Sequence, residues 1–185
     1  MFIQTEATPN PATLKFIPGR TILPTGTMEF VAADEARGSP LASNLFGVDG
    51  VTGVFFGTDF ITVTKAADRE WQHLKPALLG AIMEHFMSGA PVISGGGGEA
   101  AAVEDFDACD QDLVDTIKEL LETRVRPAVA QDGGDITFQG FREGVVFLNM
   151  RGACAGCPSS TATLKNGIEN LLKHFVPEVQ EVRPV

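Results

Sequence analysis

The sequence predicts an α+β protein built from two small mixed domains that are joined by a flexible linker rich in glycine and acidic residues. Both halves show short apolar segments typical of strands, together with amphipathic helical stripes. A stretch rich in glycine, alanine and acids separates them, and it lacks any basic side chain. We therefore expect one domain at residues 1–88, a linker at 89–109 and a second domain at 110–185.

The composition excludes several classes of partner. The chain has 185 residues, 44% of them hydrophobic, and a formal net charge of −10, which disfavours non-specific binding to nucleic acid or to anionic lipid. It contains no apolar run long enough to cross a bilayer, and its first residues lack the pattern of a secretory signal. We expect an intracellular protein that binds neither nucleic acid nor a membrane.

The acidic charge is concentrated between the two halves. Residues 89–112 carry six acidic side chains and no basic ones, whereas the flanking halves are nearly balanced. The four consecutive glycines at 95–98 are not followed by the Lys-Ser/Thr pair of a phosphate-binding loop. A solvated linker accounts for this stretch better than a binding loop does.

The first half predicts a small sheet with two helical regions. Ser39-Pro40 is a typical helix start, and Gly47 is expected to end that helix. A second apolar stripe begins near Asp68, where Pro76 predicts a kink or the start of a separate helix. Strands are predicted at residues 1–5, 14–17, 28–30, 51–56 and 60–64.

The second half predicts an α-β-β-α-β unit with a three-stranded sheet. Its first helix has apolar residues at helical spacing from Leu113, is supported by a Glu122–Arg126 pair, and is expected to stop at Pro127. A tight turn at 131–135 contains carboxylates that could hold a hard cation, although a turn that caps its own backbone is favoured. The remaining elements are strands at 136–141, 145–150 and 179–182, with a helix from 158 to 175.

Cys154 and Cys157 form a Cys-x-x-Cys pair between a predicted strand and a predicted helix. Pro158 is favoured at a first helical position, which makes Cys157 the expected N-cap and places Cys154 in the preceding loop. The positive end of the helix dipole would lower the thiol pKa values and favour thiolates. Gly152 and Gly156 would let the backbone approach whatever the sulfur atoms hold. The pattern indicates a soft-ligand site.

Three uses of this pair compete with cluster binding. Unligated thiols have little packing rationale between glycines. A structural zinc site needs four nitrogen or sulfur ligands, and the histidines at 73, 85 and 174 lie in the other half or at the far end of the last helix. A thiol–disulfide oxidoreductase using Cys154 and Cys157 remains possible, but too few elements follow the motif for a thioredoxin-like fold.

The fourth use is iron–sulfur ligation. Common clusters take four thiolates, and one chain offers two in position. Cys109 lies 45 residues before Cys154 in acidic surroundings and is interpreted as incidental. A two-fold dimer that contributes two cysteines from each subunit would supply the four ligands. A cluster held between two short loops would suit a carrier better than a catalyst.

The sequence resembles the NifU-type iron–sulfur scaffold proteins over nearly its whole length. Residues 110–185 are similar to the NifU-like C-terminal domain, and the first half is similar to the N-terminal domain of Nfu proteins of the alphaproteobacterial and mitochondrial type. The matching motifs are Met1 to Pro11, Leu14-Lys15-Phe16, Leu74-Lys75-Pro76, Asp132-Gly133-Gly134-Asp135, residues 152–160 (Gly-Ala-Cys-Ala-Gly-Cys-Pro-Ser-Ser), Leu164 to Glu169 and Pro177.

This resemblance implies a function without bond-making catalysis. It implies a homodimeric carrier that binds a [4Fe–4S] cluster, or a [2Fe–2S] cluster, through Cys154 and Cys157 of both subunits. The cluster would be received from upstream assembly factors and passed to apo-proteins such as lipoyl synthase and aconitase. The expected compartment is the bacterial cytoplasm, or the mitochondrial matrix for a mature eukaryotic form. An adaptor that recruits partners through residues 1–88 is a further possibility.

Overall fold

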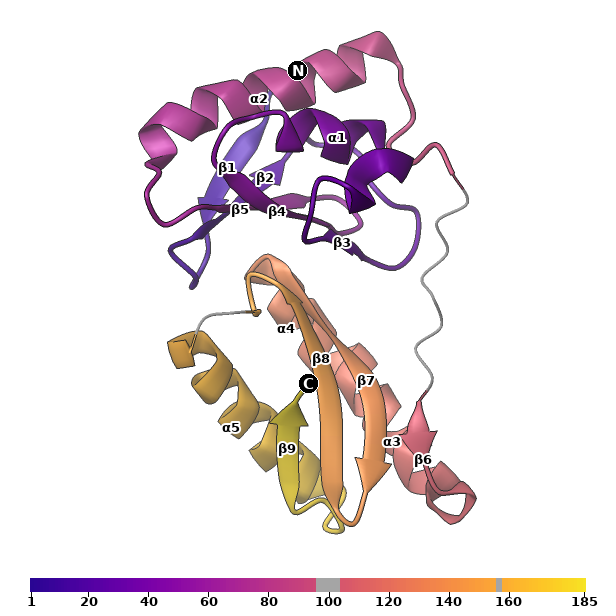
Figure 1. Ribbon diagram of the computed structural model, residues 1–185. Helices are drawn as coiled ribbons and strands as arrows, with labels where there is room; N and C mark the ends of the chain where they lie inside the picture. The colour runs from indigo at the N-terminus through magenta and orange to yellow at the C-terminus, as the bar shows by residue number, and fades with distance from the viewer. Residues whose placement is uncertain (96–103, 156–157) are drawn as a thin grey trace. The chain divides into compact units, whose positions relative to one another are not determined.

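The computed structural model describes residues 1–95, 104–155 and 158–185. The chain divides into two compact units, Met1–Ala100 and Ala101–Val185. Each unit has its own sheet, helices and apolar core (Figure 1). The α+β class predicted from the sequence is confirmed in both units.

The first unit contains a five-stranded antiparallel sheet in the order β1-β2-β5-β4-β3. The first strand begins at Gln4 rather than at Met1. Ile17, the last residue of β2, pairs with Gln4. The next residue, Pro18, lacks a backbone N–H, so β2 offers no hydrogen-bond donor to the residues before Gln4. The strands are β1 (Gln4–Ala7), β2 (Thr13–Ile17), β3 (Met28–Phe30), β4 (Val51–Phe56) and β5 (Ile61–Lys65).

Two helices, α1 (Pro40–Phe46) and α2 (Trp71–Ser88), lie on the same side of this sheet (Figure 1). A short 3₁₀ turn (Glu35–Gly38) precedes α1. The predicted cap of α1 is confirmed, because Ser39 Oγ accepts a hydrogen bond of 3.1 Å from the backbone N–H of Ala42. The apolar faces of both helices are buried against the sheet.

Helix α2 continues through Pro76, so the predicted second helix starting at this residue is wrong. Proline removes one backbone hydrogen bond, but its ring lies on the exposed side of the helix. Leu74, Leu78 and Ile82 form an uninterrupted buried stripe on the opposite side. Packing of this stripe outweighs the single missing bond.

Both ends of the predicted 89–109 linker carry structure. Val92 and Ile93 pack against the core of the first unit, and the backbone N–H of Ser94 donates to the Gly38 carbonyl at 2.9 Å. At the other end, β6 (Asp105–Phe106) pairs in parallel with β7 (Gly134–Arg142). The linker prediction missed these contacts because their partners are distant in sequence. Residues 96–103 lie outside the described parts of the chain.

The sheet of the second unit has four strands in the order β6-β7-β8-β9. β7 (Gly134–Arg142) and β8 (Val145–Gly152) form the predicted antiparallel hairpin, and β9 (Glu181–Pro184) pairs in parallel with β8. β6 adds a fourth strand to the three that were predicted. Gly140 permits this addition, because a Cβ atom there would lie 2.6 Å from the Asp105 carbonyl oxygen.

The first helical region of this unit does not stop at Pro127. It runs from α3 (Gln111–Leu120) through a π-helical turn (Leu121–Val125) into α4 (Arg126–Gln131). Proline cannot donate the hydrogen bond of a regular α-helix, and the wider turn places Pro127 at the start of α4, where no such bond is required. The chain therefore continues in helical conformation to Gln131.

Helix α5 (Pro158–Phe175) packs against the sheet through Ile168 and Leu172. The predicted apolar stripe extended to Phe175, but that side chain is 45% exposed. The buried cluster of this unit also includes Cys154, at the point where β8 leads toward α5. In the part of the chain that the structure describes, no helix has the length and apolar character needed to cross a membrane.

Candidate functional site

The loop that carries Cys154 begins where β8 ends. Gly152 closes the strand with a φ of +63°, a left-handed conformation that favours glycine. The backbone N–H of Ala155 then donates to the Gly152 carbonyl at 3.1 Å, which forms a tight turn around Cys154. This turn directs the chain away from the sheet immediately after the strand.

Cys154 is buried, with 5% of its surface exposed. Its thiol lies over Gly134, the first residue of β7, where a Cβ atom would stand 2.6 Å from Sγ. The backbone N–H of Ala153 donates to the Gly133 carbonyl at 3.2 Å. On the other side, Thr161 Oγ1 of α5 donates to the Cys154 carbonyl at 3.2 Å. The cysteine is therefore held between the start of β7 and the first turns of α5.

The expected lowering of the thiol pKa is wrong for Cys154. Burial first, and then the nearby carboxylates of Asp132 and Asp135, raise its pKa to about 12. The prediction placed Cys154 in the loop before a helix N-terminus, where the helix dipole would act on it. In the structure it belongs to the apolar core, where the loss of solvation outweighs any helix dipole.

The other predicted ligand, Cys157, lies with Gly156 outside the described residues. Its expected role as the N-cap of α5 therefore stays a prediction. The helix does begin at Pro158, as the preference of proline for the first helical position indicated. Cys154 and Cys157 stay the candidate soft ligands of this loop.

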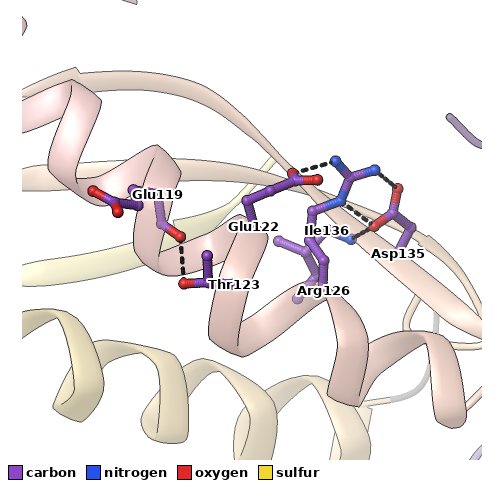
Figure 2. A network of polar contacts seen from close by, with 6 residues as sticks. All are labelled: Glu119, Glu122, Thr123, Arg126, Asp135 and Ile136. Atoms are coloured by element: carbon purple, nitrogen blue, oxygen red, sulfur yellow. Dashed lines mark hydrogen bonds and ion pairs between the residues drawn. The ribbon is translucent and has the colours of Figure 1, made fainter. Parts of the chain in front are cut away.

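A network of charged side chains joins Asp135, the residue after Gly134, to the helical region before it (Figure 2). The Asp135 side chain is buried, and its two oxygens accept hydrogen bonds from Arg126 Nε and Nη2, both at 2.8 Å. Arg126 Nη1 also donates to Glu122 Oε2 at 2.7 Å, which confirms the predicted helical pair. These contacts, with the Asp135 bond first, raise the pKa of Arg126.

One carboxylate of the acidic turn at 131–135, that of Asp135, is used within the protein. The Asp135 carboxylate binds Arg126 and accepts from the backbone N–H of Ile136 at 2.8 Å, as a structural carboxylate does. Sequence reasoning found the Glu122–Arg126 spacing but missed Asp135. The turn that brings Asp135 back to the helix depends on tertiary packing, which the sequence does not show. The available sequence signal for this ion pair was an arginine shortly before a Gly-Gly-Asp turn.

The remaining candidate ligands do not assemble into a metal site in the described part of the chain. No group of three or more histidine, cysteine or acidic residues is placed to hold a metal there. Cys109 is exposed in a 3₁₀ turn (Ala108–Asp110) that precedes α3. His85 is buried in α2 of the first unit, and neither of its ring nitrogens has a hydrogen-bond partner among the described residues.

Two protein-family models match the chain, one for each unit. The model described as "Scaffold protein Nfu/NifU N terminal" matches residues 3–89, and the model described as "NifU-like domain" matches residues 117–183. The second match contains the Cys154 loop, Gly134 and the Arg126–Asp135 pair.

Curated relatives are similar over the full chain. The human NFU1 iron–sulfur cluster scaffold homolog, mitochondrial, is 50% identical over 188 residues, covering 100% of this chain and 72% of that protein. The Arabidopsis thaliana NifU-like protein 4, mitochondrial, is 50% identical over 184 residues, covering 98% of this chain. This chain spans 65% of the length of the Arabidopsis protein, less than two thirds.

Among solved structures, the solution structure of a NifU-like protein from Saccharomyces cerevisiae matches with a TM-score of 0.47 and 28% identity. The match covers 51% of this chain and 85% of that one.

Proposed function

This chain belongs to the Nfu family of NifU-like proteins, and we propose that it binds an iron–sulfur cluster through Cys154 and Cys157 and transfers it to apo-proteins. The observation that carries the proposal is the position of Cys154 in the turn that Gly152 begins, between β8 and α5 of the NifU-like unit. Thiolates are the usual ligands of iron–sulfur clusters, so the donor chemistry of the loop fits this cargo.

The ligand count supports a cluster shared between two copies. A [4Fe–4S] cluster takes four thiolates, and the motif of one chain supplies two. The structure places Cys109 in an exposed turn before α3, outside the cysteine loop. A two-fold homodimer, in which each subunit contributes Cys154 and Cys157, gives the required four.

The burial of Cys154 means that its thiol must change its surroundings before it binds a cluster. In the conformation described, the sulfur atom packs against Gly134 instead of facing solvent. Binding a cluster between two chains therefore requires the loop to present this thiol and the thiol to lose its proton.

The competing function, a thiol–disulfide oxidoreductase, has weaker support. Such enzymes attack a disulfide through a cysteine whose pKa is near the ambient pH. The pKa of Cys154 is raised to about 12 and its thiol is buried. Cluster binding also needs a Cys154 thiolate, so what weighs against the enzyme is that only α5 and β9 follow the motif, too few elements for a thioredoxin-like fold.

Anaerobic incubation with ferrous iron and sulfide tests the proposal. We expect a brown protein with about four irons per pair of chains, measured by iron and sulfide analysis and by native mass spectrometry. Cys154→Ser and Cys157→Ser should each abolish the colour, whereas Cys109→Ser should retain it. A colourless monomer that reduces insulin disulfides catalytically would support the oxidoreductase instead.

Transfer to a client is a separate step with its own assay. The curated relatives bear mitochondrial names, and we propose that this chain acts in the same reducing setting, either the mitochondrial matrix or a bacterial cytoplasm. The loaded protein should restore the activity of apo-aconitase in the presence of an iron chelator. Restoration at the rate given by free iron and sulfide would contradict direct transfer.

A further inference from the structure

The contact between Gly134 and Cys154 leaves no room for a side chain. A Cβ atom at Gly134 would lie 2.6 Å from Cys154 Sγ, 2.8 Å from the Arg151 carbonyl oxygen and 3.0 Å from the Cys154 backbone nitrogen. Two of these three atoms belong to the backbone and cannot move aside by a change of rotamer. The position of the thiol therefore depends on a bare backbone at the start of β7.

Hydrogen bonds fix this part of β7 against the cysteine loop. Gly134 is paired with Gly152 in the hairpin, and the Gly133 carbonyl accepts from the N–H of Ala153. Gly133 has a φ of +81°, which allows the chain to turn from α4 into the strand. Ala153, the residue before Cys154, is therefore hydrogen-bonded directly to the turn that precedes β7.

The Arg126–Asp135 pair anchors the same turn to the helical layer. Asp135 is adjacent to Gly134, and its buried carboxylate makes a two-point contact with the guanidinium of Arg126 (Figure 2). Glu122, one helical turn earlier, accepts from the third guanidinium nitrogen and orients it. A planar, two-point contact restricts both distance and angle, which a single charge contact does not.

We propose that Gly134 and the Arg126–Asp135 pair are positioning residues that set where the Cys154 sulfur lies for cluster binding. None of the three supplies a ligand. They act through Cys154, as outer groups that orient metal ligands do in other metal sites. The part of this role that concerns the cluster rests on the proposed function, whereas the placement of the thiol in the metal-free protein does not.

The first test compares Gly134→Ala with Gly140→Ala. Both glycines lie in β7 and both Cβ atoms would meet backbone at about the same distance, but Gly140 faces Asp105 of β6 and not the cysteine loop. Alkylation of Cys154 by iodoacetamide in the metal-free protein, resolved by peptide mass spectrometry, should accelerate in Gly134→Ala and stay unchanged in Gly140→Ala. With iron and sulfide loaded, Gly134→Ala should lose the cluster to a chelator about 10–100-fold faster, the usual effect of removing an outer group.

The second test changes the charge pair and keeps the glycine. Arg126→Gln should accelerate both alkylation of Cys154 and loss of the cluster, and Arg126→Lys should give intermediate rates because it restores charge without the two-point contact. Arg142→Gln is the matched control, since Arg142 binds both oxygens of Asp105 at the opposite end of the same strand, at 3.0 and 2.8 Å. It should leave both rates unchanged.

The outcomes separate this inference from the proposed function. If the wild-type protein takes up no cluster but Gly134→Ala and Arg126→Gln still alter alkylation of Cys154, the proposed function fails and the positioning of the thiol stands. If the wild type loads normally and both variants match it in both rates, the positioning role is overturned. Where Gly134→Ala does not fold, judged by circular dichroism, the Arg126 variants decide.

Discussion

At the scale of single residues, burial decides the chemistry of two titratable side chains. Burial in the apolar core of the second unit raises the pKa of the Cys154 thiol. His85, in the first unit, is 1% exposed, and burial lowers its pKa. Both groups are held in their neutral forms, because a charge in either place would lose its solvation.

The stability of the first unit should fall in acid because of His85. Below a pH of about 6.5 the unfolded chain binds a proton that the folded protein resists, so the free energy of unfolding decreases as pH falls. The slope from this one group is at most about 1.4 kcal/mol per pH unit. Urea titrations of the wild type and of His85→Leu between pH 7 and 5 should show a flatter profile for the variant. His73→Leu, which alters an exposed histidine of the same helix, controls for the replacement of a histidine by leucine in α2.

A second prediction concerns Thr161, whose hydroxyl donates to the Cys154 carbonyl. Thr161→Val keeps the shape of the side chain but removes the donor, which should cost about 1 kcal/mol in the free energy of unfolding. Cys154 should also become more accessible to iodoacetamide, while Thr161→Ser should behave like the wild type. Equal alkylation rates for the valine and serine variants would show that this hydrogen bond does not hold the loop.

At the scale of elements, helix boundaries depend on what each end contacts. Ser39 is fully buried, caps α1 and also donates through Oγ to the Val92 carbonyl at 2.6 Å. One side chain therefore ties the start of α1 to the segment that follows α2. At Pro127, in contrast, the helix end expected from the sequence is absent. A π-helical turn precedes this proline, and the helical region continues beyond it.

Ser39→Ala should lower the free energy of unfolding of the first unit by about 2 kcal/mol, because it removes a cap and leaves a buried carbonyl without this donor. Urea denaturation followed by tryptophan fluorescence measures the change, since Trp71 lies in the same unit. Ser43→Ala is the comparison, since the exposed Ser43 also donates to a carbonyl, that of Ala36, at 2.7 Å. The prediction fails if Ser39→Ala and Ser43→Ala lower the free energy of unfolding by the same small amount.

At the scale of the whole molecule, two separate cores carry the two halves of the chain. The division into Met1–Ala100 and Ala101–Val185 leaves each unit with a complete sheet and its own buried cluster. A unit that buries its own apolar surface does not need the other to fold. The NifU-like unit contains the whole described cysteine site, including its anchoring network.

Fragments 1–95 and 104–185 should therefore each fold when expressed alone. Each should give a cooperative thermal transition by circular dichroism, with a midpoint temperature close to that of one transition of the full chain. When Ser39→Ala is introduced into the full chain, it should shift only the thermal transition that belongs to the first unit. Loss of cooperative unfolding in either isolated fragment would show that one unit depends on the other.

The sequence by itself determined the α+β class, most of the strands, the cap of α1 and the family, because these depend on local periodicity, turn residues and short motifs. It also indicated Cys154 and Cys157 by their spacing. Only the tertiary structure decided that Cys154 is buried over Gly134, that Asp135 binds Arg126, and that β6 joins the second sheet. Each of these contacts joins residues from different elements, and their geometry and solvation exist only after the hairpin, helices and sheet have packed together.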